Sequence, residues 1–458
     1  MSQAASAKGI NISPYRIAVV GSGPSGFYAA ESLLRSGVDV EVDVFERLPM
    51  PHGLVRYGVA PDHQKLKQVI SVFDQIADDE RFRYFGNVEV GADISLDELR
   101  QYYHAVILAC GAEEAKSLGI PGEDLPGCVT ARDFVSWYNG HPDSRLNRYD
   151  FSTENAVIIG HGNVALDVAR ILAKPIDQLQ QTDIADHALA SLARSQIKNI
   201  YIVGRRGPKE AKFSPKELRE VCTDPIWRTT ISQSYSACFD DGHKDKNLEL
   251  FTTCLNAGSP ESHGGTGRKN IFFEFFLSPR AVLGHGKVEG IVFSDHRQPV
   301  HQIPAPDRTI ACGLVVGCVG YEVKSFDNIS IDIHSRTIPN RDGRVMAGDQ
   351  AVPGLYVVGW AKRGAQGTIG TNRGDSALTV ASLLDDIKAA FGPKPSRPDV
   401  INVLRNNGCQ PVSYAQWKEV DAFETICGKA QGRPRVKITS KADFLMTIGV
   451  KEKCTTQP

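Results

Sequence analysis

Two glycine-rich loops, each preceded by a short apolar run, constrain the fold of this chain more than any other feature. The first loop, GSGPSG at residues 21–26, follows the run IAVV, and the second, GHGNVA at 160–165, follows VII. Such a run is typical of a buried parallel strand. The first glycine makes a tight turn, the second lets the backbone approach a pyrophosphate, and the third position lets helix pack on strand. Each loop therefore predicts a Rossmann-type unit that holds a dinucleotide at a helix N-terminus.

The residues after the first loop indicate which dinucleotide it holds. A helical stretch over 27–36 is followed by Val40, Val42 and Val44, which alternate as a strand that ends at Glu46, twenty residues beyond Gly26. A carboxylate at this spacing accepts hydrogen bonds from a ribose 2′-hydroxyl and repels a 2′-phosphate. We therefore predict FAD or NAD at the first loop; the alternative is a solvated carboxylate at a strand end.

The second unit ends differently. Its next predicted strand, 199–204, is followed by Arg205 and Arg206, and the connection is long because residues 174–198 are inserted. Guanidinium groups offer forked donors that suit a phosphate. The second loop is thus predicted to prefer NADPH over NADH, the alternative being two surface arginines in a loop.

Composition excludes several other classes of protein. The chain has 458 residues and a net charge of −1, which disfavours a nucleic-acid binder. No apolar run is long enough to span a bilayer. The ten cysteines include no CxxC pair, which argues against a redox-active disulfide, a built-in iron–sulfur cluster or a zinc site, and we predict no metal. Residues 1–30 lack acidic side chains but carry no secretory signal, and they make a short, poor targeting segment.

Three later apolar runs end in glycine like strands at a nucleotide site: 105–111, 314–321 and 354–360. The third precedes Gly364, Gly367 and Gly370 and a helical pattern over 376–391. An economical arrangement is an α/β fold with two Rossmann-like domains, the second inserted into the first. Residues 1–112 and 345–458 then form one domain, and residues 113–344 form the other.

Two further segments are expected at the surface. The polar stretch 222–268 is predicted to be a surface excursion. The last part of the chain, 395–458, is expected to be a solvated docking tail that carries Lys429, Arg433, Arg435, Lys437 and Lys441.

Several motifs together resemble the adrenodoxin reductase family of NADPH–ferredoxin reductases. They are PHGLVRYGVAPDH (51–63), GNVEV (86–90), NVALDVAR (163–170), VGRRGP (203–208), ELRE (217–220) and GWAKRG (359–364). The likeness covers most of the chain. QPVSY at 410–414, with Trp417, resembles the C-terminal region of the animal mitochondrial members.

The resemblance implies site residues by position. FAD contacts would be made by the loop residues Gly21, Gly23 and Gly26 and by Ser25, Glu46, Leu54, Val90, Trp360, Gly367, Thr368 and Ile369. NADPH contacts would be made by His161, Gly162, Asn163, Val164, Arg205, Arg206, Glu217 and Gly367. His63 and Glu217 are the implied catalytic positions near the nicotinamide–flavin contact, where His63 is either a proton shuttle or a structural hydrogen-bonding group.

The family's activity is the expectation that follows. NADPH would give a hydride to FAD, and single electrons would pass to a [2Fe–2S] ferredoxin that serves cytochromes P450 or iron–sulfur cluster assembly in mitochondria. The implied protein is a monomer, without a transmembrane segment, that associates at most peripherally with a membrane. The alternatives are an NADPH-dependent flavin monooxygenase and a non-enzymatic redox sensor.

This sequence departs from the family at two places. His161 stands where many relatives carry Gln or Asn, and we expect its imidazole to donate one hydrogen bond to the dinucleotide. The region around 243–246, which is densely basic in animal relatives, is mixed in charge here, and Lys212, Lys216 and Arg219 are candidates to replace it in docking ferredoxin.

Overall fold

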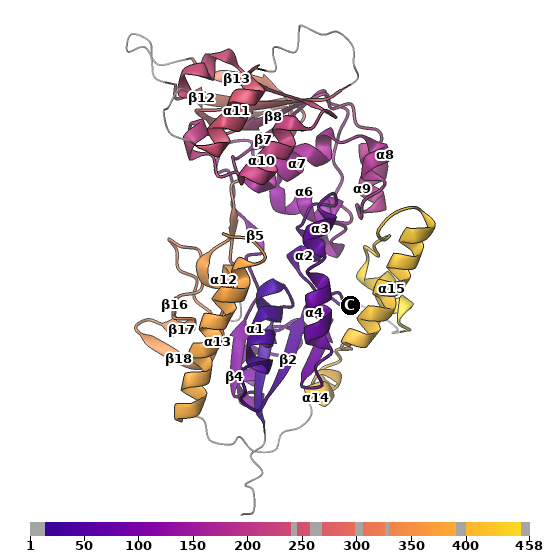
Figure 1. The fold of residues 1–458 in the computed structure, drawn as a ribbon, viewed down its shortest axis with the longest axis vertical. Helices are drawn as coiled ribbons and strands as arrows, with labels where there is room; N and C mark the ends of the chain where they lie inside the picture. Colours follow the sequence, from indigo (N-terminus) through magenta and orange to yellow (C-terminus); the bar gives the residue numbers. More distant parts are fainter. Residues whose placement is uncertain are drawn as a thin grey trace, which may run out of the picture.

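A seven-stranded sheet brings together two stretches that are far apart in the sequence. The computed structural model describes residues 14–239, 245–256, 268–297, 306–325, 329–390 and 400–449. In it the strand order of this sheet is β16 (Asn340–Arg341), β17 (Arg344–Ala347), β18 (Gln350–Val357), β4 (Ala105–Leu108), β1 (Tyr15–Val20), β2 (Val40–Glu46) and β3 (Phe82–Gly86). The five strands from β18 to β3 are parallel, and β16 and β17 add an antiparallel edge. We call this sheet and its helices the lower body (Figure 1).

Both faces of this sheet are buried, as a parallel sheet requires. On one face α1 (Pro24–Leu34), α4 (Ile70–Ala77) and α13 (Thr371–Ala390) pack on alternate strand residues such as Ile17 and Val19. The intervening residues, among them Ala18 and Val20, face a second apolar cluster that includes α5 (Leu96–Tyr102) and α14 (Val400–Asn406). The strict alternation of sides is the period of a β-strand.

A six-stranded parallel sheet forms the core of the upper body in Figure 1. Its order is β6 (Cys128–Thr130), β14 (Leu314–Gly317), β7 (Asn155–Ile159), β8 (Asn199–Val203), β10 (Asn270–Glu274) and β9 (Arg228–Ile231). One face is covered by helices, among them α6 (Ala131–Tyr138), α7 (Asn163–Ala173), α10 (Pro215–Thr223) and α11 (Lys246–Asn256). The other face is covered by the antiparallel strands β11 (Leu277–Leu283), β12 (Gly290–Asp295) and β13 (Arg308–Ala311).

Short elements complete the chain and join the two bodies. The chain enters the upper body through β5 (Glu114–Ala115) and leaves it through β15 (Tyr321–Glu322), and these two strands pair antiparallel. The other elements are α2 (Leu54–Tyr57), α3 (Gln64–Lys67), η1 (Pro142–Ser144), α8 (Ile176–Leu179), α9 (Asp186–Leu192), η2 (Pro208–Glu210), η3 (Gln233–Cys238), α12 (Trp360–Arg363), α15 (Tyr414–Ala430) and α16 (Lys441–Thr447).

The predicted α/β fold with two Rossmann-type units is confirmed. The runs at 105–111 and 314–321 each contain a strand of one of the two sheets, and the run at 354–360 contains the end of β18. The insertion 174–198 contains the helices α8 and α9. Within the described part of the chain, no helix has both the length and the apolar character needed to cross a bilayer.

The prediction that 222–268 is a surface excursion is wrong for the residues that the structure describes. β9 pairs with β10 in the upper sheet, and α11 buries Phe251 and Cys254 completely or nearly so. Leu248, Phe251 and Leu255 recur at helical spacing, a signal hidden among polar neighbours. Residues 240–244 and 257–267 lie outside the described residues. Residues 243 and 244 of the mixed-charge region at 243–246 are therefore among those not described.

The prediction of a solvated tail over 395–458 is also wrong for most of its described part, although Lys429 and Lys441 are exposed. α15 begins with a capping box formed by Ser413 and Gln416. Arg433 and Lys437 are nearly or fully buried, and the Arg433 guanidinium bonds Asp186 Oδ1 of the upper body at 2.5 Å. The C-terminal segment therefore fastens the two bodies to each other.

Candidate functional site

The first glycine loop is shaped for a close ligand. Gly21 has φ +108°, and a Cβ on it would lie 2.5 Å from the Ala109 carbonyl oxygen. A Cβ on Gly26 would lie 2.1 Å from the Gly21 carbonyl oxygen, whereas a Cβ on Gly23 would meet nothing within 4 Å. No side chain caps the N-terminus of α1, which begins directly after Gly23. The free N–H groups and the open space at Gly23 therefore fit a pyrophosphate.

Glu46 is held rigidly beside this loop. Its Oε2 accepts hydrogen bonds from the backbone N–H (3.0 Å) and hydroxyl (2.7 Å) of Ser22, and its Oε1 accepts one from the Leu48 N–H at 3.1 Å. β1 and β2 are parallel neighbours, so the carboxylate lies at the carboxyl end of the sheet beside the loop. The arrangement fits a ribose whose 2′-hydroxyl is free.

The segment that begins at Gly359 packs against the first loop. Gly359 has φ +70°, and a Cβ on it would lie 2.0 Å from Ser25 Oγ, so only glycine allows this approach. Ser25 Oγ donates to Asn372 Oδ1 at 3.1 Å in buried surroundings, which ties α1 to α13. The segment between α12 and α13, which carries the predicted residues Gly367, Thr368 and Ile369, thus lies next to the first loop.

Leu54 and Trp360 each follow a glycine that closely approaches the first loop, and Val90 shares a buried cluster with Val20, the residue before the loop. Leu54 begins α2 and is 42% exposed, which is unusual for a leucine and leaves an apolar surface for a ring to cover. Trp360 begins α12, where its indole N–H donates to the Gln366 carbonyl at 3.1 Å. Val90 is buried in the adjacent apolar cluster.

The second loop repeats the geometry of the first. Gly160 has φ +135°, and a Cβ on it would lie 2.3 Å from the Cys318 carbonyl oxygen, whereas a Cβ on Gly162 would meet nothing within 4 Å. No side chain caps α7, which begins at Asn163. Arg205 and Arg206 are exposed in the turn after β8, the strand next to the one that leads into the loop.

His161 does not lie as expected. Its ring packs against Phe213 and Phe275, with centroid distances of 5.5 and 5.0 Å, and its Nε2 lies 3.3 Å from the Ile202 carbonyl. Burial lowers its pKa to about 4, so the ring is neutral. The imidazole therefore points into the interior of the upper body, and only the backbone of His161 belongs to the surface of the second glycine loop.

Where the two bodies meet, an ion cluster surrounds His63. His63 precedes α3 of the lower body, and its Nε2 lies 3.3 Å from Glu217 Oε2 and 3.5 Å from Glu220 Oε2 on α10. The Arg170 side chain on α7 has no exposed surface, and its guanidinium bonds Asp62 at 3.0 Å and Asp167 at 2.9 Å. The predicted pair His63 and Glu217 is thus brought together across the boundary between the bodies.

The cluster shifts the protonation of its members. Burial lowers the pKa of His63, but the hydrogen bond to Glu220 and the charges of Asp167 and Asp62 outweigh it, so the pKa is raised above its ordinary value. Burial raises the pKa of Asp167 to about 6, against the opposing charges of Arg170 and His63. The cluster therefore raises the pKa of both His63 and Asp167 and favours their protonated forms.

His63, Asp167 and Glu217 also offer ligand atoms within 4.8 Å of one another, a spacing that a metal ion could use. The Arg170 guanidinium already lies 2.9 Å from Asp167 Oδ1 and 3.5 Å from Glu217 Oε2. An ion would have to compete with this fixed cation, so we assign no metal here.

Comparison with known proteins decides the family. Residues 15–204 match the family model described as pyridine nucleotide-disulphide oxidoreductase. The mitochondrial NADPH:adrenodoxin oxidoreductase of Mus musculus is 41% identical over 456 residues, with 95% of this chain and 92% of the relative covered. The NADPH-ferredoxin reductase FprA of Mycobacterium tuberculosis is 42% identical, with 94% and 98% covered. The solved structure of that FprA in complex with NADPH superposes with a TM-score of 0.87 at 41% identity, with 95% and 99% covered.

The chain belongs to the adrenodoxin reductase family. The family resemblance predicted from the motifs is thereby confirmed. Membership does not test the individual site residues, whose assignments stay predictions supported by the geometry above. The nine described cysteines of this reductase are free thiols.

Sequence reasoning missed Arg170, Asp62 and Asp167 of this reductase. All three stand in motifs that carry the resemblance, but nothing local shows that a guanidinium lies fully buried. The available signal was Asp167 and Arg170 at i and i+3 within the otherwise apolar helix α7, which indicates one polar stripe facing a partner.

The His63 cluster predicts a pH-dependent contribution to stability. A raised pKa in the folded state means that the contribution of His63 is fully present below its unfolded pKa of about 6.5 and is lost as the pH rises through the folded pKa. We therefore expect His63→Gln to lower the melting temperature more at pH 6 than at pH 8.5, measured by thermal unfolding of the FAD-loaded protein. A loss that is equal at both pH values, or larger at pH 8.5, would contradict a protonated His63 in the folded protein.

Proposed function

We propose that this protein is an FAD-dependent NADPH–ferredoxin reductase. The proposal rests on a difference between the residues beside the two glycine loops. A fixed carboxylate, Glu46, lies beside the first loop, and the exposed pair Arg205 and Arg206 lies beside the second. The first fits FAD and the second fits NADPH. Family membership supports the same pairing of cofactors.

Each cofactor would be held by groups that the structure supplies. The N-terminus of α1, Glu46 and the segment around Thr368 would hold FAD, and the N-terminus of α7 with the two arginines would hold NADPH. FAD supplies the chemistry that a protein side chain lacks, since it accepts a hydride from NADPH and passes electrons on singly.

The contribution of the chain is orientation and proton handling. The closed turns at Gly21 and Gly160 fix the direction from which each dinucleotide enters. His63 holds a proton at Nε2 between Glu217 and Glu220, at the junction of the two bodies, and Arg170 keeps this cluster in place. We propose His63 and Glu217 as the catalytic pair on this ground.

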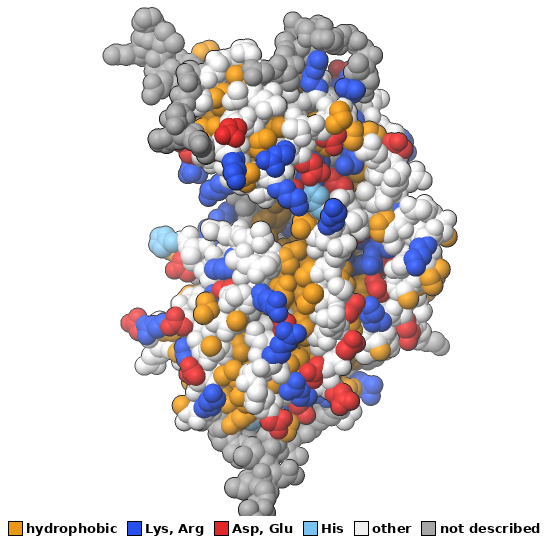
Figure 2. All heavy atoms as spheres, in the orientation of Figure 1, with side chains coloured by type: hydrophobic (Ala, Val, Ile, Leu, Met, Phe, Trp, Pro, Cys, Tyr) orange, Lys and Arg blue, Asp and Glu red, His pale blue; other side chains and the backbone are white. Residues whose placement is uncertain are grey.

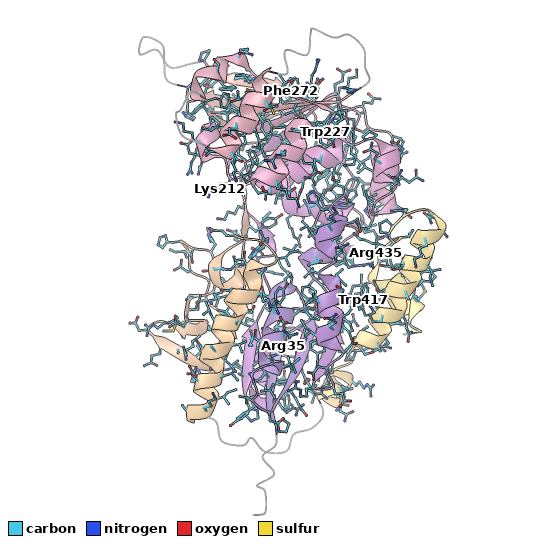
Figure 3. All side chains as sticks on the ribbon, viewed as in Figure 1. Arg35, Lys212, Trp227, Phe272, Trp417 and Arg435 are labelled. Carbon is cyan, nitrogen blue, oxygen red and sulfur yellow. The ribbon has the colours of Figure 1, made fainter. Side chains whose placement is uncertain are left out.

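The electrons are proposed to leave to a separate [2Fe–2S] ferredoxin. Lys and Arg side chains gather on the rim of the upper body that faces the hollow between the two bodies (Figure 2). Lys212 is exposed at this rim and is labelled in Figure 3. Lys216 and Arg219 are exposed on α10. Such a surface would meet an acidic ferredoxin through complementary charge.

The proposed function has a direct test. NADPH should rapidly bleach the visible absorbance of the bound FAD, and NADH should bleach it much more slowly. The NADPH-reduced protein should then reduce cytochrome c only when a [2Fe–2S] ferredoxin is added. Oxygen consumption coupled to a hydroxylated product without ferredoxin would instead show a monooxygenase, and a flavin that NADPH does not bleach would indicate a redox sensor.

The finer assignments are proposals as well. We propose that 1–112 and 345–458 form the FAD domain and 113–344 the NADPH domain. The two sheets support this division except at its second boundary, because β16 and Arg344 at the start of β17 already belong to the lower sheet. The animal relative is named mitochondrial, but the mycobacterial relative is equally similar, so a mitochondrial location rests on the C-terminal resemblance and is tested by cell fractionation. We further propose a monomer, testable by light scattering.

A further inference from the structure

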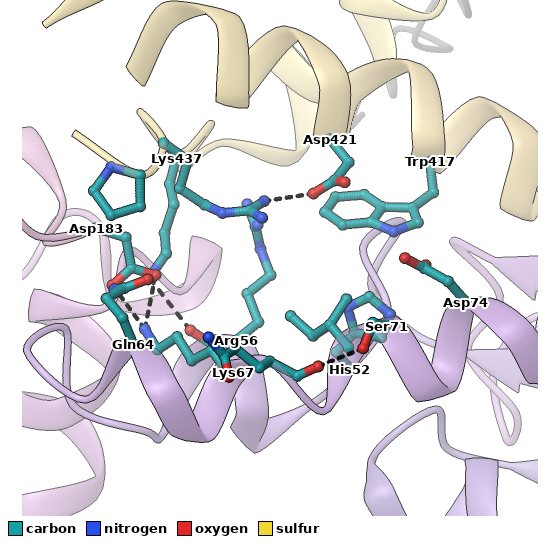
Figure 4. A pocket seen from close by; sticks show the side chains of 14 residues that line it. His52, Arg56, Gln64, Lys67, Ser71, Asp74, Asp183, Trp417, Asp421 and Lys437 are labelled. Atoms are coloured by element: carbon teal, nitrogen blue, oxygen red, sulfur yellow. Dashed lines mark hydrogen bonds and ion pairs between the residues drawn. The ribbon is translucent and has the colours of Figure 1, made fainter. Parts of the chain in front are cut away.

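A cavity of about 500 Å³ lies outside both dinucleotide cradles. It is partly open to solvent and is lined by residues of α2, α3 and α4 on one side and by α15 and residues 434–437 on the other, with Asp183 of the upper body at one end (Figure 4). Nothing in the proposed electron transfer uses it. Seven of the residues that line it are charged, and three buried nitrogen atoms among its lining residues have no hydrogen-bond partner in the part of the chain that the structure describes: His52 Nδ1, Arg56 Nε and Trp417 Nε1.

One end of the cavity holds an unpaired donor and an unpaired acceptor. Among the described residues, Trp417 Nε1 and His52 Nδ1 have no hydrogen-bond partner, although the two side chains are at most 1% exposed. Both rings line the cavity and contact each other edge to face, with centroids 5.7 Å apart. The two nitrogen atoms have almost no accessible surface, so an occupant pairs them only when one of the rings turns toward the cavity. A buried polar group left without a partner costs about 1–3 kcal/mol, so an occupant that pairs both is favoured.

The hydrogen bonds around His52 determine what that occupant must offer. Tyr414 donates its single hydroxyl proton to Asp74 Oδ1 at 2.7 Å, so its oxygen accepts from His52 Nε2 at 3.1 Å. Burial lowers the pKa of His52 to about 3, which keeps the ring neutral. His52 Nδ1 is therefore an acceptor, while the Trp417 indole N–H is a donor. One hydroxyl group satisfies both, because it accepts and donates at the same oxygen.

The other end of the cavity has an excess of cations. Lys67 and Lys437 both bond the single carboxylate of Asp183, at 2.7 and 3.1 Å. Lys437 Nζ also donates to the backbone carbonyl of Asn139, whereas Lys67 Nζ contacts only the two Asp183 oxygens within the described ranges. Burial lowers the pKa of Lys67, and the nearby charge of Arg435 adds to this.

Arg435 has donors to spare at the same end. Its Nη1 bonds Asp421 at 2.5 Å and Glu424 at 3.2 Å, and these are the ion pairs that the described residues give it. The guanidinium is 20% exposed and lines the cavity. An anionic group between Lys67 and Arg435 would therefore meet two cations with unused protons.

We propose that this cavity binds a small hydroxyl-bearing anion, a phosphate ester or a hydroxycarboxylate. Its anionic group lies between Lys67 and Arg435, and a hydroxyl lies between Trp417 and His52. The occupant would link α15 and the segment after it to α3 and to His52 before α2. His52 is itself tied to the first glycine loop, because its backbone N–H donates to the Ser22 carbonyl at 3.1 Å. This inference does not depend on the proposed reductase activity.

Calorimetric titration of the FAD-loaded protein with paired probes tests the ligand class. Glycerol 3-phosphate is compared with glycerol, which lacks the anion, and L-malate with succinate, which lacks the hydroxyl. We expect the complete member of at least one pair to bind at least about tenfold more tightly than its partner, and to raise the melting temperature. The pair that binds distinguishes a phosphate from a carboxylate source. If neither glycerol 3-phosphate nor L-malate binds at millimolar concentration, the proposal is wrong and the cavity holds water.

Matched variants locate the binding. Lys67→Met should weaken the bound probe by about 10- to 100-fold, the effect of one charge-assisted hydrogen bond. Trp417→Phe should remove the preference for the hydroxyl-bearing probe. Lys429→Met, which removes an exposed charge from the same helix α15, should change nothing.

If all three variants bind the probe equally well, the probe is an adventitious additive only and the proposed site is wrong. If Lys67→Met fails to fold, the hydroxyl preference of Trp417→Phe decides alone. NADPH bleaching is recorded separately on each variant, so failure of the proposed function and failure of this site are told apart.

Discussion

Gly26→Ala is expected to abolish retention of FAD and to destabilise the lower body. The added Cβ would lie 2.1 Å from the backbone oxygen of Gly21, which no side-chain rearrangement relieves. α1 must therefore move away from β1, at a cost of about 1–3 kcal/mol or more, and the cradle opens. We expect less than about a tenth of the wild-type FAD content after gel filtration, measured by absorbance, together with a lower melting temperature of the apoprotein.

Gly23→Ala is the matched control for this prediction. Gly23 has φ −73°, which alanine adopts freely, and its Cβ would meet nothing within 4 Å. The apoprotein should therefore unfold within about 1 kcal/mol of wild type. The methyl group nevertheless occupies the open space that we assign to the pyrophosphate, so FAD affinity should fall by about tenfold or more. Full FAD affinity in Gly23→Ala would show that the pyrophosphate lies elsewhere.

The local signals of the sequence were sufficient for the two nucleotide-binding units, but not for β9, α11 and α15. The alternation of Val40, Val42 and Val44 predicts a strand that is present as β2, and the glycine spacing predicts both cradles with their tight turns. These features depend on a few neighbouring residues, which is why a linear pattern shows them. The same signals predict that the strands of the upper sheet are inserted in sequence between strands of the lower sheet, because a second glycine-ended strand, β18, occurs late in the chain and joins the lower sheet.

What the sequence did not show depends on partners distant along the chain. Arg433 is a basic residue in a polar stretch, and it is buried because its guanidinium bonds Asp186 and the backbone carbonyls of Thr182 and Ile184. Arg170 is buried in the same way because Asp62 comes to it from the other body. The inward turn of His161 requires Phe213 and Phe275, which lie more than 50 and 110 residues later in the chain. Burying a charge or an imidazole is favourable only with such partners, so no local pattern encodes it.

The selectivity for NADPH is the second large effect. The double variant Arg205→Ala, Arg206→Ala is expected to raise KM for NADPH strongly, because each lost charge-assisted hydrogen bond to the 2′-phosphate costs about 1.5–3 kcal/mol. That corresponds to about 10- to 100-fold for each arginine that binds. The value of kcat/KM for NADH should change by no more than about twofold, since NADH lacks the 2′-phosphate. Steady-state ferredoxin-dependent reduction of cytochrome c with both nucleotides measures the two effects together.

The control for this prediction removes the same charge from the other end of the same strand. Arg194 and Lys198 are exposed just before β8 begins, whereas Arg205 and Arg206 are exposed just after it ends. Arg194→Ala with Lys198→Ala lowers the net charge equally but lies at the edge of the sheet away from the second loop. If long-range attraction of the anionic nucleotide were the cause, the two double variants would behave alike and the effect would fade with added salt. A loss confined to Arg205 and Arg206, and to NADPH, identifies direct contact with the 2′-phosphate; equal losses for both nucleotides would refute it.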